Sequence, residues 1–131
     1  MEEEGVPTAQ LMTSEIITVT PGTLVEDAVQ TLLEEDIGSL VVVDGDNRLV
    51  GVVTSNDFLE VISNSELEAG ATVEQYMTDQ VITISPGDSI QTAAARMITN
   101  GISHLPVEDP DEGITGMITT TDITAYAVSH A

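Results

Sequence analysis

Two short stretches of the chain carry the same residue types at the same spacing. Segment 51–57 reads GVVTSND, and segment 116–122 reads GMITTTD. A carboxylate such as that of Asp57 or Asp122 can accept two hydrogen bonds from a vicinal diol, for example the 2′ and 3′ hydroxyls of ribose. The threonine three residues earlier supplies a hydroxyl that can hold a phosphate or the sugar, and the N–H groups that begin a helix favour an anion. One interpretation of the motif is therefore a sugar-phosphate site.

The same motif also has a purely structural interpretation. Thr54 and Thr119 can each accept a hydrogen bond from an N–H group at the start of a helix, and the aspartate three residues later lies at the positive end of that helix. Such a capping box begins many helices and explains both residue types by itself. The motif alone leaves both interpretations open.

The spacing of 65 residues between the two motifs extends over nearly the whole chain. Met12-Thr13 falls on Met77-Thr78, and no gap is needed from there to the second aspartate. The chain is therefore two copies of one unit of about 60 residues. A unit of that size is marginal alone because it buries too little surface, so the copies are expected to share one module by pseudo-twofold symmetry. The expected boundaries are 7–63 for the first repeat, 64–71 for a linker and 72–129 for the second repeat.

Each repeat is expected to follow the order strand, helix, strand, strand, helix, which is a mixed α+β pattern preceded by a short helical turn. Apolar residues at helical spacing indicate the helices, and Thr23-Leu-Val-Glu26 reads as a capping box for the first of them. The elements expected in the first repeat are a helical turn 7–12, a strand 16–20, a helix 23–35, strands 40–43 and 49–53, and a helix 57–63. Those of the second are 72–77, 81–85, 90–98, 105–107, 114–119 and 122–130.

The acidic segments 44–47 and 108–113 are expected to be turns. The first resembles the start of a calcium-binding loop. The fifth, sixth and twelfth positions of such a loop require an oxygen ligand, glycine and glutamate, but here they hold Arg48, Leu49 and Ser55. A metal site is therefore not predicted.

Composition excludes several classes of function. The formal net charge is −21, with 2 basic and 23 acidic residues, so nucleic acid and anionic membranes are poor partners. A hydrophobic fraction of 41% argues against disorder, and we hypothesise a halophilic archaeal source whose molar salt screens the self-repulsion. Cysteine is absent, and no Ser–His pair or phosphate loop of the required form occurs, so the chain is not expected to be an enzyme. No apolar run is long enough to span a membrane, and the N-terminus lacks the basic residues with which a signal peptide begins. A cytoplasmic location is therefore expected.

The motifs together resemble a known family. Met-Thr, a strand near Pro-Gly, Ile-Ser-His-Leu-Pro-Val at 102–107, an acidic turn and Gly-x-x-Thr-x-x-Asp, most of them duplicated, are similar to a tandem pair of CBS domains, named for cystathionine beta-synthase. The resemblance covers about residues 7–129. It implies a stand-alone regulatory module that folds as a pair, forms a homodimer, needs no obligatory cofactor and binds an adenosyl effector. It also implies a regulated partner protein.

The resemblance places two adenosyl clefts between the repeats. In both, the aspartate would hold ribose, the threonine hydroxyl would reach toward phosphate, and adenine would lie against apolar residues and the backbone after Met-Thr. The first cleft would combine Met117, Thr119, Thr121 and Asp122 with Ser14, Ile16, Ile37 and Gly38. The second would combine Val52, Thr54, Asn56 and Asp57 with Asp79, Val81, Ile102 and Ser103.

Few basic side chains are available to such a ligand. His104 stands where the family contacts phosphate, although it is equally well interpreted as a half-buried strand residue, and the first repeat has Ser39 there. Arg48 is expected to be solvated, Arg96 to form a surface ion pair, and His130 to be inert. With so little positive charge, the expected ligand is AMP, adenosine or S-adenosylmethionine rather than ATP.

A scaffold that binds no nucleotide is the alternative function. It would use apolar helix faces for dimerisation or for docking a partner, because exposed apolar patches commonly mark interfaces. The faces in question lie on Val25–Leu33, Phe58–Ile62, Ile90–Ile98 and Ile123–Val128.

Overall fold

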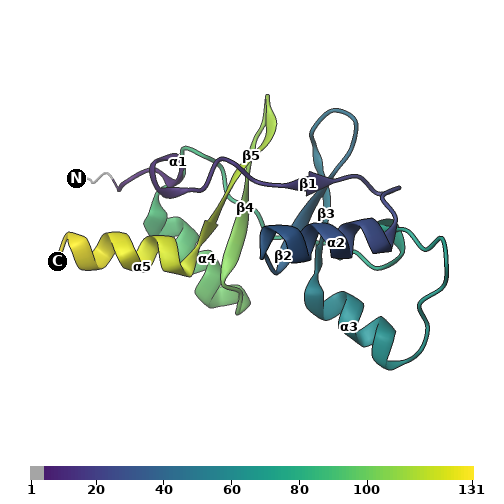
Figure 1. Cartoon of the computed structure of the whole chain (residues 1–131). Helices are drawn as coiled ribbons and strands as arrows, with labels where there is room; N and C mark the ends of the chain where they lie inside the picture. Colours follow the sequence, from purple (N-terminus) through teal and green to yellow (C-terminus); the bar gives the residue numbers. More distant parts are fainter. Residues whose placement is uncertain (1–4) are drawn as a thin grey trace. The chain divides into compact units, whose positions relative to one another are not determined.

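The computed structural model describes residues 5–131, which form two compact α+β units. One unit is Ile17–Val81. The other contains Ile82–Ala131 together with the N-terminal segment that ends at Ile16. The units are therefore displaced along the chain from the two sequence repeats, by about ten residues. Figure 1 shows the elements of each unit.

The unit Ile17–Val81 is built on a three-stranded sheet of order β1-β2-β3, in which β1 is parallel and β3 antiparallel to β2. Apolar side chains from the sheet and from α2 form its core, centred on Leu40, Val42 and Val53, each 0% exposed. The elements are β1 (Thr18–Val19), α2 (Val25–Glu35), β2 (Ser39–Val43), β3 (Leu49–Thr54), α3 (Ser55–Ser63) and a 3-10 helix (Val73–Gln75).

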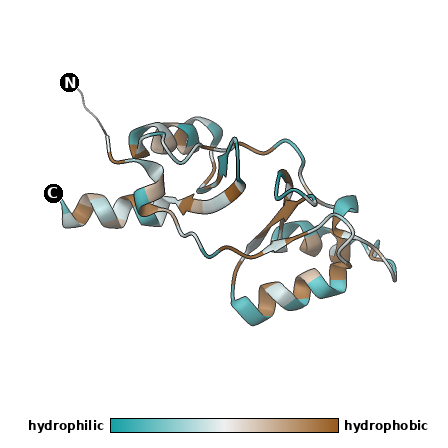
Figure 2. Cartoon of the chain, turned by 90° about the horizontal axis from the view of Figure 1, so that it is seen from above, coloured by the Kyte–Doolittle hydropathy of each residue, from teal (hydrophilic) through white to brown (hydrophobic). Residues whose placement is uncertain are grey.

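The other unit has a two-stranded antiparallel sheet and a matching core, with Leu105, Val107 and Ile118 in the places of the three residues just named. Figure 2 shows brown, hydrophobic stretches in the strands and alternating colours along the helices, as expected for helices with one buried face. The elements are α1 (Thr8–Leu11), α4 (Ile90–Asn100), β4 (His104–Asp109), β5 (Gly113–Thr119) and α5 (Thr120–Ser129).

Each Met-Thr segment pairs with a strand of the other sequence repeat. The N–H of Thr13 donates to the Met117 carbonyl at 2.9 Å, and the N–H of Met117 donates back to Thr13 at 3.0 Å. Thr78 and Val52 make the equivalent two bonds, both at 2.9 Å. The first repeat thus supplies an edge segment to β5, and the second supplies one to β3. This reciprocal exchange explains why the compact units do not coincide with the repeats.

The exchange extends through the helical turns that precede Met-Thr. Backbone bonds at corresponding positions, related by the 65-residue offset, attach each turn to the loop before a helix of the other repeat. These bonds are Thr8 N–H to Asp88 O at 2.7 Å and Val73 N–H to Thr23 O at 2.9 Å, and Ile90 N–H to Val6 O and Val25 N–H to Ala71 O, both at 2.9 Å.

The glycine of the repeated motif permits this close approach. A Cβ atom on Gly51 would lie 2.7 Å from the sulfur of Met77 and 2.9 Å from the carbonyl oxygen of Thr78. At Gly116 the corresponding distances, to Met12 and Thr13, are 2.6 and 2.8 Å. Side chains do not normally tolerate such contacts with backbone, so the position requires glycine for the approach of another chain segment.

Three expectations about local structure were wrong, and two of them concern the starts of helices. The capping box at Thr23 does not form: the residue before α2 is Leu24, without a side-chain cap, and the Thr23 hydroxyl accepts from the Thr20 N–H at 3.1 Å instead. The helices after the repeated motif begin at Ser55 and Thr120, two residues earlier than expected, because the threonine itself is the N-cap.

The strand expected at 81–85 is also absent, apart from one parallel bridge between Ile84 and Val107. In the first repeat the ladder includes the pair Thr18–Val41. The corresponding partner of Thr83 is Pro106, and proline has no N–H to donate to a neighbouring strand. The acidic segment 44–47 is a turn, as expected, in which the Asp44 carboxylate accepts from the Asp46 N–H at 2.8 Å.

Replacement of Gly51 by alanine is expected to destabilise the protein by about 1–3 kcal/mol, because the added methyl group forces apart the β3 backbone and the Thr78 carbonyl. Chemical denaturation followed by circular dichroism measures the change. Gly45→Ala is the matched control, since nothing lies within 4 Å of its Cβ position, and a change within about 0.5 kcal/mol is expected there. Equal losses in both variants would contradict the close-approach explanation.

Candidate ligand-binding site

The repeated motif lies where a strand runs directly into a helix. β3 ends at Thr54 and α3 begins at the next residue, while β5 ends at Thr119 and α5 begins at the next. Both threonines have extended backbone geometry, with φ and ψ of −124° and 163° in one and −123° and 164° in the other. The first N–H groups of both helices therefore have no acceptors in the helix backbone.

Both motifs form complete capping boxes, so the structural interpretation is confirmed. The Asp57 N–H donates to the Thr54 hydroxyl at 3.2 Å, and the Thr54 N–H donates to Oδ2 of Asp57 at 2.8 Å. In the other unit the corresponding distances, between Asp122 and Thr119, are 3.1 and 2.9 Å. Each carboxylate is half-buried and its orientation is fixed by the backbone of its own N-cap.

Capping engages only one oxygen of each carboxylate. Oδ2 accepts the N-cap hydrogen bond, whereas Oδ1 of Asp57 and of Asp122 accepts none from the residues that the structure describes. A half-buried carboxylate with one fixed and one open oxygen can still accept from a hydroxyl of a ligand. The two interpretations of the motif are therefore compatible rather than exclusive.

The two threonine hydroxyls differ. That of Thr54 donates to Oδ2 of Asp57 at 3.1 Å, so its proton is already used. That of Thr119 only accepts, from the Asp122 N–H, and its proton makes no hydrogen bond within residues 5–131. The motif in the unit containing α5 therefore offers one donor more to an anion.

Segments that precede β2 and β4 lie beside the motif of their own unit. The Ser55 N–H donates to the Gly38 carbonyl, and the Thr120 N–H donates to the Ser103 carbonyl, both at 2.9 Å. Ser39 is opposite Thr54 in the sheet, and His104 is opposite Thr119. His104 is half-buried at this position, next to the start of α5.

The structure distributes the predicted site residues over its two units. The unit Ile17–Val81 holds Ile37, Gly38, Val52, Thr54, Asn56, Asp57, Asp79 and Val81. The other unit holds Ser14, Ile16, Ile102, Ser103, His104, Met117, Thr119, Thr121 and Asp122. In each unit the Met-Thr segment runs beside the repeated motif, because Thr13 and Thr78 are hydrogen-bonded to the strand that leads into that motif. The combinations across units, such as Ile37 with Asp122, stay predictions.

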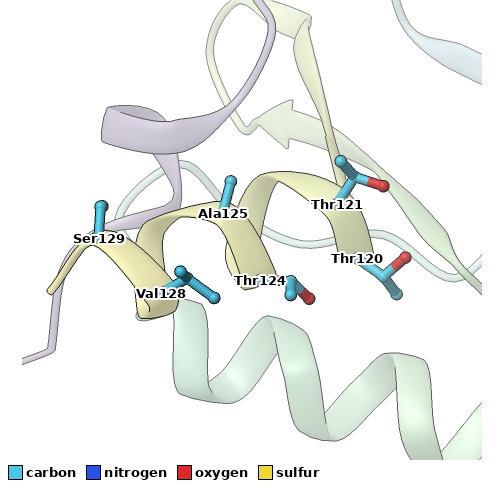
Figure 3. Close-up of a pocket in the computed structure, with 6 residues that line it drawn as sticks. All are labelled: Thr120, Thr121, Thr124, Ala125, Val128 and Ser129. Carbon is cyan, nitrogen blue, oxygen red and sulfur yellow. The ribbon is translucent and has the colours of Figure 1, made fainter. Parts of the chain in front are cut away.

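Two hollows in the unit that contains α5 lie apart from its capping aspartate. One follows α5 itself, with Thr120, Thr124 and Val128 on one side of the helix and Thr121, Ala125 and Ser129 on another (Figure 3). The second lies between α4 and α5 and is mainly apolar, with Met97, Ile98 and Ile102 among its lining residues. Of the predicted site residues, Thr121 lines the first of these two hollows and Ile102 the second, and Asp122 lines neither of the two.

The basic side chains are used differently from what we expected. Arg96 forms no ion pair with the described residues; its guanidinium donates to the Thr83 carbonyl at 2.6 Å, a bond that the sequence did not predict. His130 stacks on Tyr126 with 3.9 Å between ring centroids. Arg48 is half-buried in the 44–48 turn.

Neither a membrane span nor a metal centre is found in the described part of the chain. Among residues 5–131, every helix is too short or too polar to cross a bilayer, and no cluster of three or more histidine or acidic side chains has a metal-binding arrangement.

Comparison with known proteins identifies the repeats. The family model for the CBS domain matches residues 9–64 and again residues 73–129. Among curated relatives, a 17.7 kDa protein of Acidianus ambivalens is 30% identical over 115 residues, which cover 88% of this chain and 69% of the relative. Homoserine O-acetyltransferase of Methanohalobium evestigatum is 36% identical over 115 residues, which cover 88% of this chain but only 23% of the enzyme.

Two proteins with similar solved folds were crystallised with adenosyl compounds. The CBS domain pair of protein MJ0100, in complex with 5′-methylthioadenosine and S-adenosyl-L-methionine, has a TM-score of 0.85 at 25% identity, over 98% of this chain and 100% of that one. CBSX2 in complex with AMP has a TM-score of 0.86 at 27% identity, over 96% of this chain and 98% of that one.

Proposed function

This chain belongs to the CBS domain family, and from that premise we propose that it is a regulatory module that binds an adenosyl ligand such as AMP, adenosine or S-adenosylmethionine. One observation carries the proposal. Each Thr-x-x-Asp motif holds a half-buried carboxylate by Oδ2 and leaves Oδ1 open beside a helix N-terminus. Adenosyl compounds in the two similar structures support the ligand class. The output is a change in dimer geometry or in the binding of a partner protein, rather than catalysis.

The two motifs are expected to prefer different parts of the ligand class. His104 lies opposite Thr119, whose hydroxyl proton is unused, whereas Ser39 lies opposite Thr54, whose proton is engaged. A ligand phosphate is therefore expected to bind more tightly at the motif that contains Asp122 than at the motif that contains Asp57. An uncharged or sulfonium ligand suits the motif that contains Asp57 equally well, because no basic group is needed there.

Each capping aspartate is expected to be required for binding. Asp122→Asn or Asp57→Asn keeps an oxygen that can cap the helix but loses the charge, so AMP affinity falls about ten- to a hundredfold, the loss of one charge-assisted hydrogen bond. The free energy of unfolding changes by less than about 1 kcal/mol. Isothermal titration calorimetry and thermal melting, both in molar KCl, measure the two quantities.

Glu60→Gln is the charge-matched control, because this exposed glutamate removes one negative charge from α3 without touching the capping box. Its AMP affinity is expected to equal that of the unmodified protein. Unchanged AMP affinity in both aspartate variants would leave capping as the role of the motif and favour the ligand-free scaffold.

A second expectation concerns ligand charge. AMP is expected to bind more tightly than ATP in the absence of divalent metal, because the chain carries 23 acidic and only 2 basic residues and repels the additional phosphates. Calorimetry at a single KCl concentration, with each nucleotide in turn, gives the ratio. Tighter binding of metal-free ATP would contradict the charge argument.

We also propose that the chain is a homodimer adapted to concentrated salt in a cytoplasm. Apolar side chains on α2 and on the helices of the other unit are widely exposed: Leu33 is 73% exposed, Ile98 82% and Val128 72%. The mainly apolar hollow between α4 and α5 adjoins Ile98. A second copy would remove this surface from water, while salt screens the repulsion between two acidic chains.

Salt is expected to raise both the melting temperature and the dimer fraction between dilute and molar KCl, because screening weakens the repulsion within and between chains. Sedimentation equilibrium should give twice the chain mass of 13.8 kDa in molar KCl. Ile98→Ser shifts the protein toward monomer, and its exposed neighbour Thr99→Ala is the control. A melting temperature independent of KCl would argue against salt adaptation.

A further inference from the structure

The helices of the two units differ in charge, although the repeats that supply them share one backbone arrangement. α2 carries four acidic side chains and α3 carries two, and neither helix has a basic side chain. α4 has no acidic side chain and one arginine, Arg96, and α5 has Asp122 as its only charged residue. The helix pair α2–α3 is therefore strongly acidic, whereas the pair α4–α5 is nearly neutral.

This difference extends to the exposed apolar face of each helix pair. Glu26 lies two helical turns before Leu33, so both side chains are on one face of α2. The corresponding residues of α4 are Gln91 and Ile98. Leu33 is 73% exposed and Ile98 82%. A contact that covers Leu33 therefore also approaches a carboxylate, whereas a contact that covers Ile98 approaches an uncharged amide.

The two helix pairs also differ in shape. The mainly apolar hollow between α4 and α5 has a volume of about 280 Å³. The lining residues that are smaller than their counterparts in the first repeat are Ala94, Ile123 and Thr124, in place of Val29, Phe58 and Leu59. A cavity of roughly 150 Å³ already accepts a benzene ring, so this hollow has room for a leucine side chain. Leu33 and Leu59, which is 61% exposed, are such side chains on the acidic helix pair.

We propose that the covering partner is a second copy of the chain in antiparallel orientation, with α2 and α3 of one protomer packed against α4 and α5 of the other. A parallel dimer would pack α2 and α3 against the same two helices of its partner, so that two sets of carboxylates repel each other. In the antiparallel dimer each acidic helix pair meets the nearly neutral pair that contains Arg96, and twofold symmetry forms this contact twice. The inference rests on the homodimer proposed above and adds its orientation.

Cysteine cross-linking tests the orientation, because the chain has no cysteine of its own. Leu33→Cys and Ile98→Cys mark corresponding positions of the two helix pairs. The two single variants, one of them carrying a mass tag, are mixed in dilute buffer, brought to molar KCl and treated with a short bismaleimide. The product that joins the two different variants is expected in about tenfold excess over either product that joins like variants, because like charges disfavour the parallel contact.

A second pair of variants and a control accompany this measurement. Leu59→Cys mixed with Thr124→Cys repeats the test on α3 and α5, so a dimer weakened by one substitution does not decide the result. Asp46→Cys mixed with Ile98→Cys is the control, since Asp46 is exposed in the turn before β3, whereas α3 follows the opposite end of that strand. No cross-linked product is expected from the control mixture.

The possible failures are distinguished by the chain mass in molar KCl, measured by sedimentation equilibrium. A dimer that yields mainly products of like variants would overturn the antiparallel orientation and leave the proposed homodimer intact. A dimer without any cross-link at either pair of positions would also overturn it, because the interface would then lie away from these helices. A protein that remains monomeric would overturn both proposals and leave the surface to a different partner, while AMP affinity is measured independently.

Discussion

The reciprocal pairing of each Met-Thr segment with the motif strand of the other repeat is the contact on which the rest of this structure depends. It supplies an edge to β3 and to β5, whose unpaired N–H and C=O groups would otherwise face solvent. It requires glycine at positions 51 and 116, and it makes each compact unit a composite of both repeats. Neither copy can complete its core alone, which is how two marginal units of about 60 residues become one stable chain.

Under the proposed function, the motif that this pairing supports would combine two tasks in one side chain, capping a helix and binding a ligand. A carboxylate that only capped a helix could be exposed and mobile, and one that only bound a diol would need other groups to orient it. Here the N-cap backbone orients Asp57 and Asp122 through Oδ2, so that Oδ1 is presented in a fixed direction without further residues. For the proposed ligand, the capping hydrogen bonds would thus also preorganise the carboxylate and lower the entropy lost on binding.

The duplication made most of this architecture predictable from the sequence, because an offset of 65 residues relates elements, cores and motifs alike. The paired Met-Thr segments were placed beside the motif only through the family resemblance, since hydrogen bonds between distant segments leave no local periodicity. The prediction of a strand at 81–85 was wrong because a β-branched pattern carries no information about the partner strand. The proline in that partner, Pro106, lies over twenty residues away in the sequence. The Thr23 box failed because Thr20 competes for the same hydroxyl. The arrangement of ligand residues across units depends on geometry that no local pattern encodes.

The two repeats share one backbone arrangement but differ in the residues at two corresponding places, the edge of the sheet and the position opposite the motif threonine. At the edge of the sheet the first repeat adds β1 to β2 as a parallel strand, whereas in the second repeat a single bridge joins Ile84 to β4. Beside the motif the first repeat has Ser39 and the second has His104, and each unit holds one half-buried arginine, Arg48 or Arg96. With a net charge of −21, a cation in a half-buried position changes the local potential more than it would in a balanced chain. The two motifs are therefore equivalent in backbone and differ in the side chain opposite the threonine. Under the proposed function, this difference is the basis on which the two motifs would distinguish ligands by charge.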